Sequence, residues 1–268
     1  MFKLIKASIF KLFRDITFRI TLIIGLSLAV MMPLLYAFLD FMVESESAIF
    51  ARGESLFISG FSCTSNFGLT IPINLVVFTV GEFTYGTIRN KIIAGHKKSE
   101  IYIALLITGF IFTILLMTVY IAVSTLIATM IGGFSLDALG GARFFIFFLI
   151  IGILSYLFIV VFSVFIATSI RAIGGSLPLI IISLVMLGLI PTFVMISDLA
   201  VGQEFTGANP IMWIDPLYMI NLYASTSQIA DFGDLSNEMI AAGIIVPLIW
   251  TAVFTFLGML QFSKRDVK

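Results

Sequence analysis

The sequence contains few charged side chains for its length. Only 11% of its 268 residues are Asp, Glu, Lys or Arg, whereas 60% are hydrophobic, and the mean hydropathy is +1.16. A soluble domain carries about a quarter charged residues, so a large core does not explain the deficit. The composition excludes an ordinary soluble protein and predicts an all-α protein that crosses a membrane several times.

Cysteine and histidine are nearly absent. Cys63 is the single cysteine, which excludes an intramolecular disulfide and a cysteine-based metal cluster. His96 is the single histidine, and we expect it to be solvated in a basic segment. The apolar runs hold almost no ionisable side chains, which argues against an ion-coupled transporter and against an intramembrane protease. We therefore expect no catalytic residue and no metal in this chain.

A phosphate-binding loop of the form Gly-x-x-x-x-Gly-Lys-Ser/Thr is also missing from the sequence. The chain is therefore not expected to bind and hydrolyse ATP by that route, or to bind a cofactor of its own. No nucleic-acid partner is expected either.

The sequence does contain long apolar runs, and there are six of them. Each is long enough to cross about 30 Å of hydrocarbon as a helix. The third run exceeds that need, so its cytoplasmic end is expected to project from the bilayer. The predicted spans are roughly 20–38, 57–80, 101–131, 144–169, 177–197 and 239–262.

The N-terminal segment 1–19 is predicted to be an amphipathic helix lying on the membrane surface, ahead of a permease domain over residues 20–268. Apolar residues recur at helical spacing over 2–19, and Lys3, Lys6, Lys11 and Arg14 supply a basic side for anionic headgroups. The run that follows has the length of a span and lacks a small-residue cleavage site, so we expect the N-terminus to be retained.

Basic residues are distributed very unevenly between the two sides of this six-span layout. If the N-terminus is cytoplasmic, all but two of the 15 basic residues lie inside, the exceptions being Arg52 and Arg143. Cytoplasmic loops carry an excess of Lys and Arg. The asymmetry therefore predicts a multi-pass protein of the cell membrane with both termini in the cytoplasm.

Residues 81–99 form a polar segment between the second and third runs, and its pattern predicts a short capped helix. Thr84 is expected to be the N-cap, with Glu82 where the helix dipole favours negative charge. Gly95 suits the left-handed position that ends a helix. One face is predicted to carry apolar side chains at helical spacing: Tyr85, Ile88 and Ile92.

At these residues the chain resembles a known family. Glu82, followed by Gly86-Thr87-Ile88-Arg89 and then Ala94-Gly95, is similar to the first cytoplasmic loop of ABC type-2 exporter permeases. The resemblance implies a coupling helix that seats in a cleft of a separate ATPase subunit, which would bind ATP and Mg. A basic loop that only fixes topology would need neither caps nor an apolar face. The residues expected to contact the ATPase, or to orient the loop, are Glu82, Tyr85, Gly86, Thr87, Ile88, Arg89, Asn90, Ile92 and Gly95.

The resemblance has three further implications. The N-terminal helix would be an elbow helix on the cytoplasmic leaflet. Two permease subunits would form the path between them, with a homodimer favoured over a heterodimer because nothing marks a degenerate half. The long outer segment 198–238, with its Pro and Trp residues, would hold short helices that re-enter the outer leaflet. An ordinary outer loop is the alternative for this segment.

The second run carries a polar stripe whose members are spaced by three or four residues, which predicts one helical face. Such residues either line a translocation path or hold neighbouring helices together. For the stripe as a whole we favour the path, which in the resembled family the second and fifth spans border. Pro72 is expected to bend this helix. The stripe consists of Ser59, Cys63, Asn66, Thr70 and Asn74.

These observations predict the membrane subunit of an ATP-driven exporter, with a mechanical rather than a catalytic role. A polar, uncharged path favours amphipathic peptides or lipophilic compounds as cargo. Two alternatives stay open. The first is an ABC membrane subunit for polysaccharide or lipid export or for peptide immunity, and the second is an ATP-independent channel or membrane scaffold.

Overall fold

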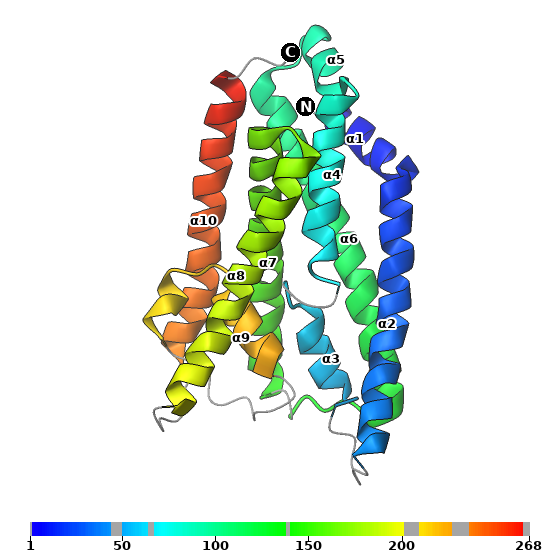
Figure 1. The fold of residues 1–268 in the computed structure, drawn as a ribbon, viewed down its shortest axis with the longest axis vertical. Helices are drawn as coiled ribbons and strands as arrows, with labels where there is room; N and C mark the ends of the chain where they lie inside the picture. Colours follow the sequence, from blue (N-terminus) through cyan, green and yellow to red (C-terminus); the bar gives the residue numbers. More distant parts are fainter. Residues whose placement is uncertain are drawn as a thin grey trace.

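The protein folds as an all-α membrane protein. A computed structural model describes residues 2–43, 50–63, 67–137, 140–200, 209–226 and 236–264, and within these ranges it contains helices and no strand. The helices are α1 (Phe2–Arg14), α2 (Ile16–Met42), α3 (Gly53–Gly60), α4 (Thr70–Thr84), α5 (Thr87–Ile93), α6 (Lys98–Gly132), α7 (Gly141–Ile170), α8 (Ile173–Ala200), the 3₁₀ helix η1 (Pro210–Trp213), α9 (Tyr218–Thr226) and α10 (Asn237–Lys264) (Figure 1).

Five of the six predicted spans are continuous helices. Each predicted run lies inside one of α2, α6, α7, α8 and α10, and all five helices are long and apolar enough to cross a bilayer. The 35 residues of α6 give it a length of about 52 Å at 1.5 Å per residue. That exceeds the ~30 Å of hydrocarbon, and the N-terminal end of α6 projects beside α5 at one end of the molecule (Figure 1).

The second predicted span, 57–80, is not a continuous helix. It is divided into α3 and α4, which follow one another along the bundle with a non-helical break between them (Figure 1). The chain folds back within this break, because a Cβ on Gly68 would lie only 1.9 Å from the carbonyl oxygen of Ser62. The Tyr156 hydroxyl donates to that carbonyl at 3.2 Å. Side chains and local turns can thus satisfy backbone groups that a broken helix leaves open.

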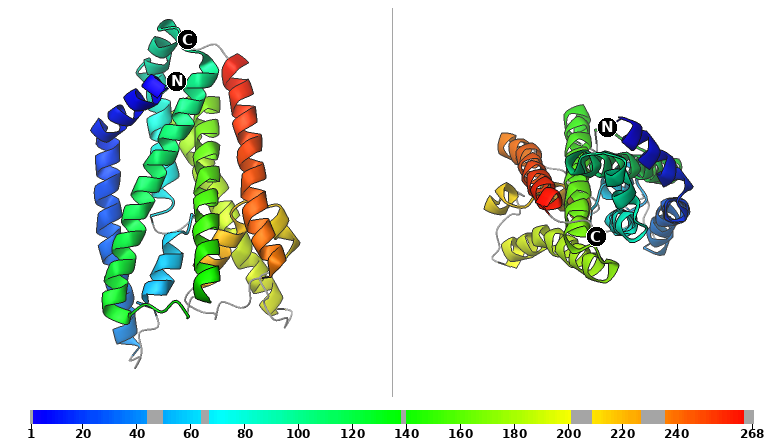
Figure 2. Two further views of the ribbon diagram at one scale, coloured as in Figure 1. Left: turned by 180° about the vertical axis from the view of Figure 1, so that it is seen from behind. Right: turned by 90° about the horizontal axis from the view of Figure 1, so that it is seen from above.

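The N-terminal helix is shorter than the predicted 2–19. It ends at Arg14, and Asp15 then caps α2 by accepting a hydrogen bond from the Thr17 N–H at 2.8 Å. Leu4, Ser8 and Leu12 are buried on one side of α1, and its opposite side is exposed. The helix is therefore amphipathic, and its buried side packs against the protein itself. Figure 2 shows α1 lying across the end of the bundle, at an angle to α2.

Helix α7 occupies the centre of the bundle, with α6, α8 and α10 around it (Figure 2). Its apolar stretch is 61% buried, compared with 17–22% for those of α2, α8 and α10. A central aromatic cluster helps to hold these helices together, for example Phe162 of α7 against Phe254 of α10, with ring centroids 5.0 Å apart. The peripheral helices expose mostly apolar side chains, as expected for surfaces that face lipid or a second subunit.

The described part of segment 198–238 contains short helices. Leu217, Tyr218 and Ile220 are almost completely buried, and α9 packs among α3, α7, α8 and α10. Figure 1 shows η1 and α9 beside the lower halves of α8 and α10. The Trp250 indole of α10 donates to the Ile214 carbonyl at 2.8 Å and holds this segment to the last span. The short helices expected within 198–238 are therefore present, while residues 201–208 and 227–235 lie outside the described part of the chain.

Candidate functional site

The segment 81–99 forms a sharp corner followed by a short helix. Helix α4 ends at Thr84, and Gly86, with a φ of 66°, starts α5 in a direction 55° away from α4. A left-handed φ is accessible to glycine at no steric cost. The segment lies at the same end of the molecule as α1 and the C-terminal end of α10 (Figure 1).

The predicted N-cap was wrong, and the predicted C-terminal signal is confirmed. Thr84 is the last residue of α4, where its hydroxyl donates to the Val80 carbonyl at 3.1 Å, because α4 continues without a break up to the glycine corner. Glu82 consequently lies in the last turn of α4 and not at the start of α5. Gly95 has a φ of 89°. Its N–H bonds to the Ile92 carbonyl and the His96 N–H to the Lys91 carbonyl, the two bonds of a Schellman cap.

The predicted apolar face of this helix is only partly correct. Ile88 is fully buried and Ile92 is half-buried, and both pack against a cluster that includes Leu4 of α1 and Ile101 of α6. Tyr85 does not share this face, because it belongs to the corner before α5, and 80% of its surface is exposed. The apolar side of α5 therefore docks on the chain's own helices.

A different face of the segment points outward. Tyr85, Arg89 and Ile93 are spaced by four residues, and all three are exposed, Tyr85 by 80% and Ile93 by 74%. The neighbouring Asn90 is exposed as well. Ile93 was missed by the sequence reasoning, although its spacing from Arg89 would have placed it on the same face. We call these four residues the outer face of α5.

A buried carboxylate holds this end of the molecule together. Glu82 is 1% exposed, and its two oxygens accept hydrogen bonds from Lys11 of α1 and from Lys91 of α5, the latter at 2.8 Å. Lys91 also donates to the Ser8 hydroxyl at 3.3 Å. Lys11 likewise donates to the Thr87 hydroxyl at 3.3 Å. Glu82, Lys11 and Lys91 thus form an ion triad that joins α4, α1 and α5.

The triad could be predicted only in part. Glu82 was a candidate for orienting the loop, but Lys11 was assigned to lipid headgroups as part of the basic side of the N-terminal helix. The two residues lie 71 positions apart, so their spacing gave no sign of the contact. Two positive groups around one carboxylate compensate for its burial. The geometry makes α5 a rigid extension of α4 that is also fastened to α1.

The polar stripe of the second span is divided by the break. Ser59 lies on α3, Cys63 lies in the break, and Thr70 and Asn74 lie on α4. The prediction of one continuous helical face was therefore wrong. Asn66 lies outside the described residues.

Most of the described stripe members form local bonds. Ser59 and Cys63 are buried, and the Ser59 hydroxyl donates to the Leu56 carbonyl at 3.3 Å. The Asn74 amide donates to the Thr70 carbonyl at 2.8 Å. Pro72 stands in the first turn of α4 and not inside a continuous helix. Among the described residues, no group of three or more His, Cys, Asp or Glu could hold a metal ion.

A comparison with protein families decides the class of this molecule. A family model described as "ABC-2 family transporter protein" matches residues 73–267, from the first turn of α4 onward. The chain belongs to the ABC-2 transporter family. Neither curated proteins nor solved structures gave a match.

The matched region of this ABC-2 permease includes the corner, α5 and all later spans. Helices α1, α2 and α3 lie before it, yet all three contact the matched part closely, α1 through the ion triad and α2 and α3 along α6. The chain is therefore a multi-pass membrane permease of an ABC transporter.

Proposed function

We propose that this ABC-2 permease is the transmembrane subunit of an ATP-driven exporter, and that α5 is the coupling helix that a separate ATPase contacts. The outer face of α5 carries this proposal. Tyr85 at the corner and Arg89 and Ile93 on α5 are exposed, and α5 is fixed on its other side. Exposed aromatic, Arg and aliphatic side chains on a rigid element are typical of contact surfaces between proteins.

The connections of α5 suggest how movement of the ATPase would reach the spans. Ile88 anchors α5 against α6 and α1, and the ion triad fastens it to α4. A displacement of α5 would therefore move the upper half of the second span together with α1. ATP and Mg would be bound by the partner subunit and none by this chain.

We propose that the α5 end faces the cytoplasm. This assignment places α1, the start of α6 and the end of α10 on the side where the basic residues accumulate. Both termini would then be cytoplasmic in a protein of the cell membrane. Helix α1 would lie at the surface of the inner leaflet.

The permease is proposed to act as a dimer, with a homodimer as the first choice. One six-span unit supplies one wall of a path, and α2 and α8 expose broad apolar faces that a second subunit could cover. The path would run beside α3 and α4, where the stripe residues offer hydrogen bonds without fixed charge. Such a wall suits amphipathic peptides or lipophilic compounds, whereas an anionic glycan would favour Arg or Lys along the path.

The coupling role can be tested with paired charge and apolar substitutions on α5. Arg89→Glu and Ile93→Asp should weaken association with the ATPase, or uncouple hydrolysis from transport, while membrane insertion stays normal. Leu136→Asp is the matched control for Ile93→Asp, because Leu136 is 48% exposed in the segment after α6, at the end of the molecule opposite α5. Co-purification and transport that are unchanged in both α5 variants would exclude this face as the ATPase contact.

The cargo is tested separately. Cells with and without the permease and its ATPase are exposed to a panel of membrane-active peptides and drugs, and survival is measured. The bulky Asn66→Trp substitution is expected to block transport while sparing assembly and basal ATP hydrolysis. If tolerance does not change and a surface glycan disappears on deletion, the cargo is a glycan.

A further inference from the structure

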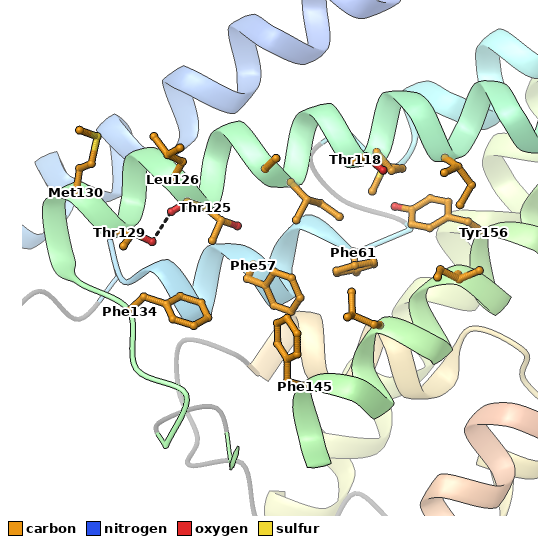
Figure 3. Close-up of a pocket in the computed structure, with 16 residues that line it drawn as sticks. Phe57, Phe61, Thr118, Thr125, Leu126, Thr129, Met130, Phe134, Phe145 and Tyr156 are labelled. Atoms are coloured by element: carbon orange, nitrogen blue, oxygen red, sulfur yellow. Dashed lines mark hydrogen bonds between the residues drawn. The ribbon is translucent and has the colours of Figure 1, made fainter. Parts of the chain in front are cut away.

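A deep groove opens between α6 and α7, with α3 as its floor. Its volume is about 800 Å³, and α6 supplies most of one wall. In Figure 3, Met130 and Phe134 lie at one end of the groove, and Thr118 and Tyr156 lie at the other. The groove is distinct from the outer face of α5, because none of the residues that line the groove belongs to that face.

The lining has the chemistry of a site for a hydrocarbon chain. None of the described residues that line the groove is charged. Phe57 of α3 stacks on Phe145 of α7 with ring centroids 5.0 Å apart, and together they form an aromatic floor (Figure 3). Aliphatic side chains of α6 and α7 line most of the remaining wall, and three threonines and Tyr156 add hydroxyl groups.

The rim of the groove is continuous with the surface that faces lipid. Leu126 and Met130 on α6 are 59% and 81% exposed, and Ile153 on α7 is 44% exposed. In an ABC-2 permease these positions on two spans contact the hydrocarbon of the bilayer. An apolar groove that opens there meets lipid chains and not water.

The groove is at least as long as one leaflet is thick. From Ile114 to Met130 the wall runs along sixteen residue steps of α6, or about 24 Å at 1.5 Å per residue. Half of the ~30 Å hydrocarbon core is about 15 Å. The groove is therefore long enough to hold an acyl chain that extends across a whole leaflet from the end opposite α5.

We propose that this groove binds one acyl chain of a bilayer lipid from the leaflet opposite α5, with its ester end toward Met130 and Phe134 and its methyl end toward Tyr156. Moving a chain from bulk lipid gains little from the hydrophobic effect, because lipid tails are as apolar as the wall. Selective binding comes instead from close contact with a preformed surface. The bound chain lies against the floor formed by α3 and by Tyr156, whose hydroxyl donates to the break in the second span.

The test uses the full-length permease in vesicles of phosphatidylcholine that carries a photoactivatable diazirine on one acyl chain. Ala122 lines the groove and is exposed, so Ala122→Trp should fill it. Ala252→Trp on α10 is the matched control, because Ala252 is an exposed alanine on another span, outside the groove. Both variants are first compared with the wild type for monodispersity and helix content.

In the wild type, labelling mapped by mass spectrometry should concentrate on α3 and on the groove side of α6 and α7. It should fall to the level of α10 in Ala122→Trp and stay unchanged in Ala252→Trp. Even labelling over all lipid-facing helices, or no loss in Ala122→Trp, would overturn the proposal. Displacement of the label by a peptide that the permease transports would also overturn it, since the groove would then be a cargo site.

Discussion

Substitution of Glu82 should release α1 from the rest of the molecule. Glu82→Gln keeps the shape of the side chain but removes the charge that Lys11 and Lys91 share. The side chain of Lys91 is only 14% exposed, so in this variant its positive charge is left largely buried without an opposite charge. The side chain of Lys11 is 39% exposed, so water can solvate its ammonium group. Breaking a buried ion pair by removing one partner costs about 3–5 kcal/mol.

The exposure of Lys11 places the expected cost at the lower end of that range, about 3 kcal/mol. The same reasoning ranks the two lysines. Lys91→Met leaves the buried carboxylate with its more hydrated partner and should cost more than Lys11→Met, which removes a partly exposed interaction worth about 0–1 kcal/mol. The expected order of destabilisation is Glu82→Gln, then Lys91→Met, then Lys11→Met.

Amide hydrogen exchange over residues 2–14 measures this effect directly, because α1 can open locally while the spans stay folded. A cost of about 3 kcal/mol corresponds to roughly a hundredfold loss of protection in α1. Lys97→Met is the control, because Lys97 is an exposed lysine close by that takes no part in the triad. Exchange in Glu82→Gln equal to wild type, or an equal loss in Lys97→Met, would refute the reasoning.

Three further predictions concern the break, the topology and the assembly. Gly68→Ala should destabilise the permease by roughly 1–3 kcal/mol and lower its Tm, because the new Cβ meets the Ser62 backbone. Gly174→Ala is the control and should change Tm little, because the space around Gly174 is open. Equal losses of Tm in the two variants would contradict the reasoning. An impermeant maleimide should label Asp137→Cys in intact cells but Lys97→Cys only after permeabilisation, and labelling of both from outside would rule out the topology. Mass measurement of the purified complex should show at least a dimer, and transport by a reconstituted monomer with its ATPase would contradict it.

The five continuous spans were predictable because each is a long apolar run, and a helix is the structure that satisfies its backbone within a bilayer. The break between α3 and α4 was missed because residues 57–80 were interpreted as one helical span with a polar stripe. Its composition nevertheless held a signal. Residues 59–70 are rich in Ser, Gly, Thr and Asn, which favour turns. The same residues were interpreted as a polar stripe on a helix, and periodicity alone cannot separate the two cases.

The candidate site was predictable where it depends on local chemistry. Gly95 ends α5 as expected, because a left-handed residue at that position is a property of a few neighbouring residues. Which face of α5 points outward is decided by tertiary packing against α1 and α6, so Ile88 turned inward and Ile93 outward. The link between Lys11 and Glu82 is equally tertiary and leaves no trace in the spacing of either residue.

The break in the second span has a mechanical consequence. A continuous helix carries an axial displacement from one membrane face to the other, because its hydrogen bonds resist stretching. Two half-helices joined by a non-helical segment can shift relative to one another through backbone rotations at the junction. Movement imposed on α4 from the α5 end can thus be absorbed at mid-membrane, while α3 stays seated against α6 and α9. The halves of the permease in the two leaflets then need not move together. The half that contains α3 can stay in place while the half that contains α4 moves relative to it.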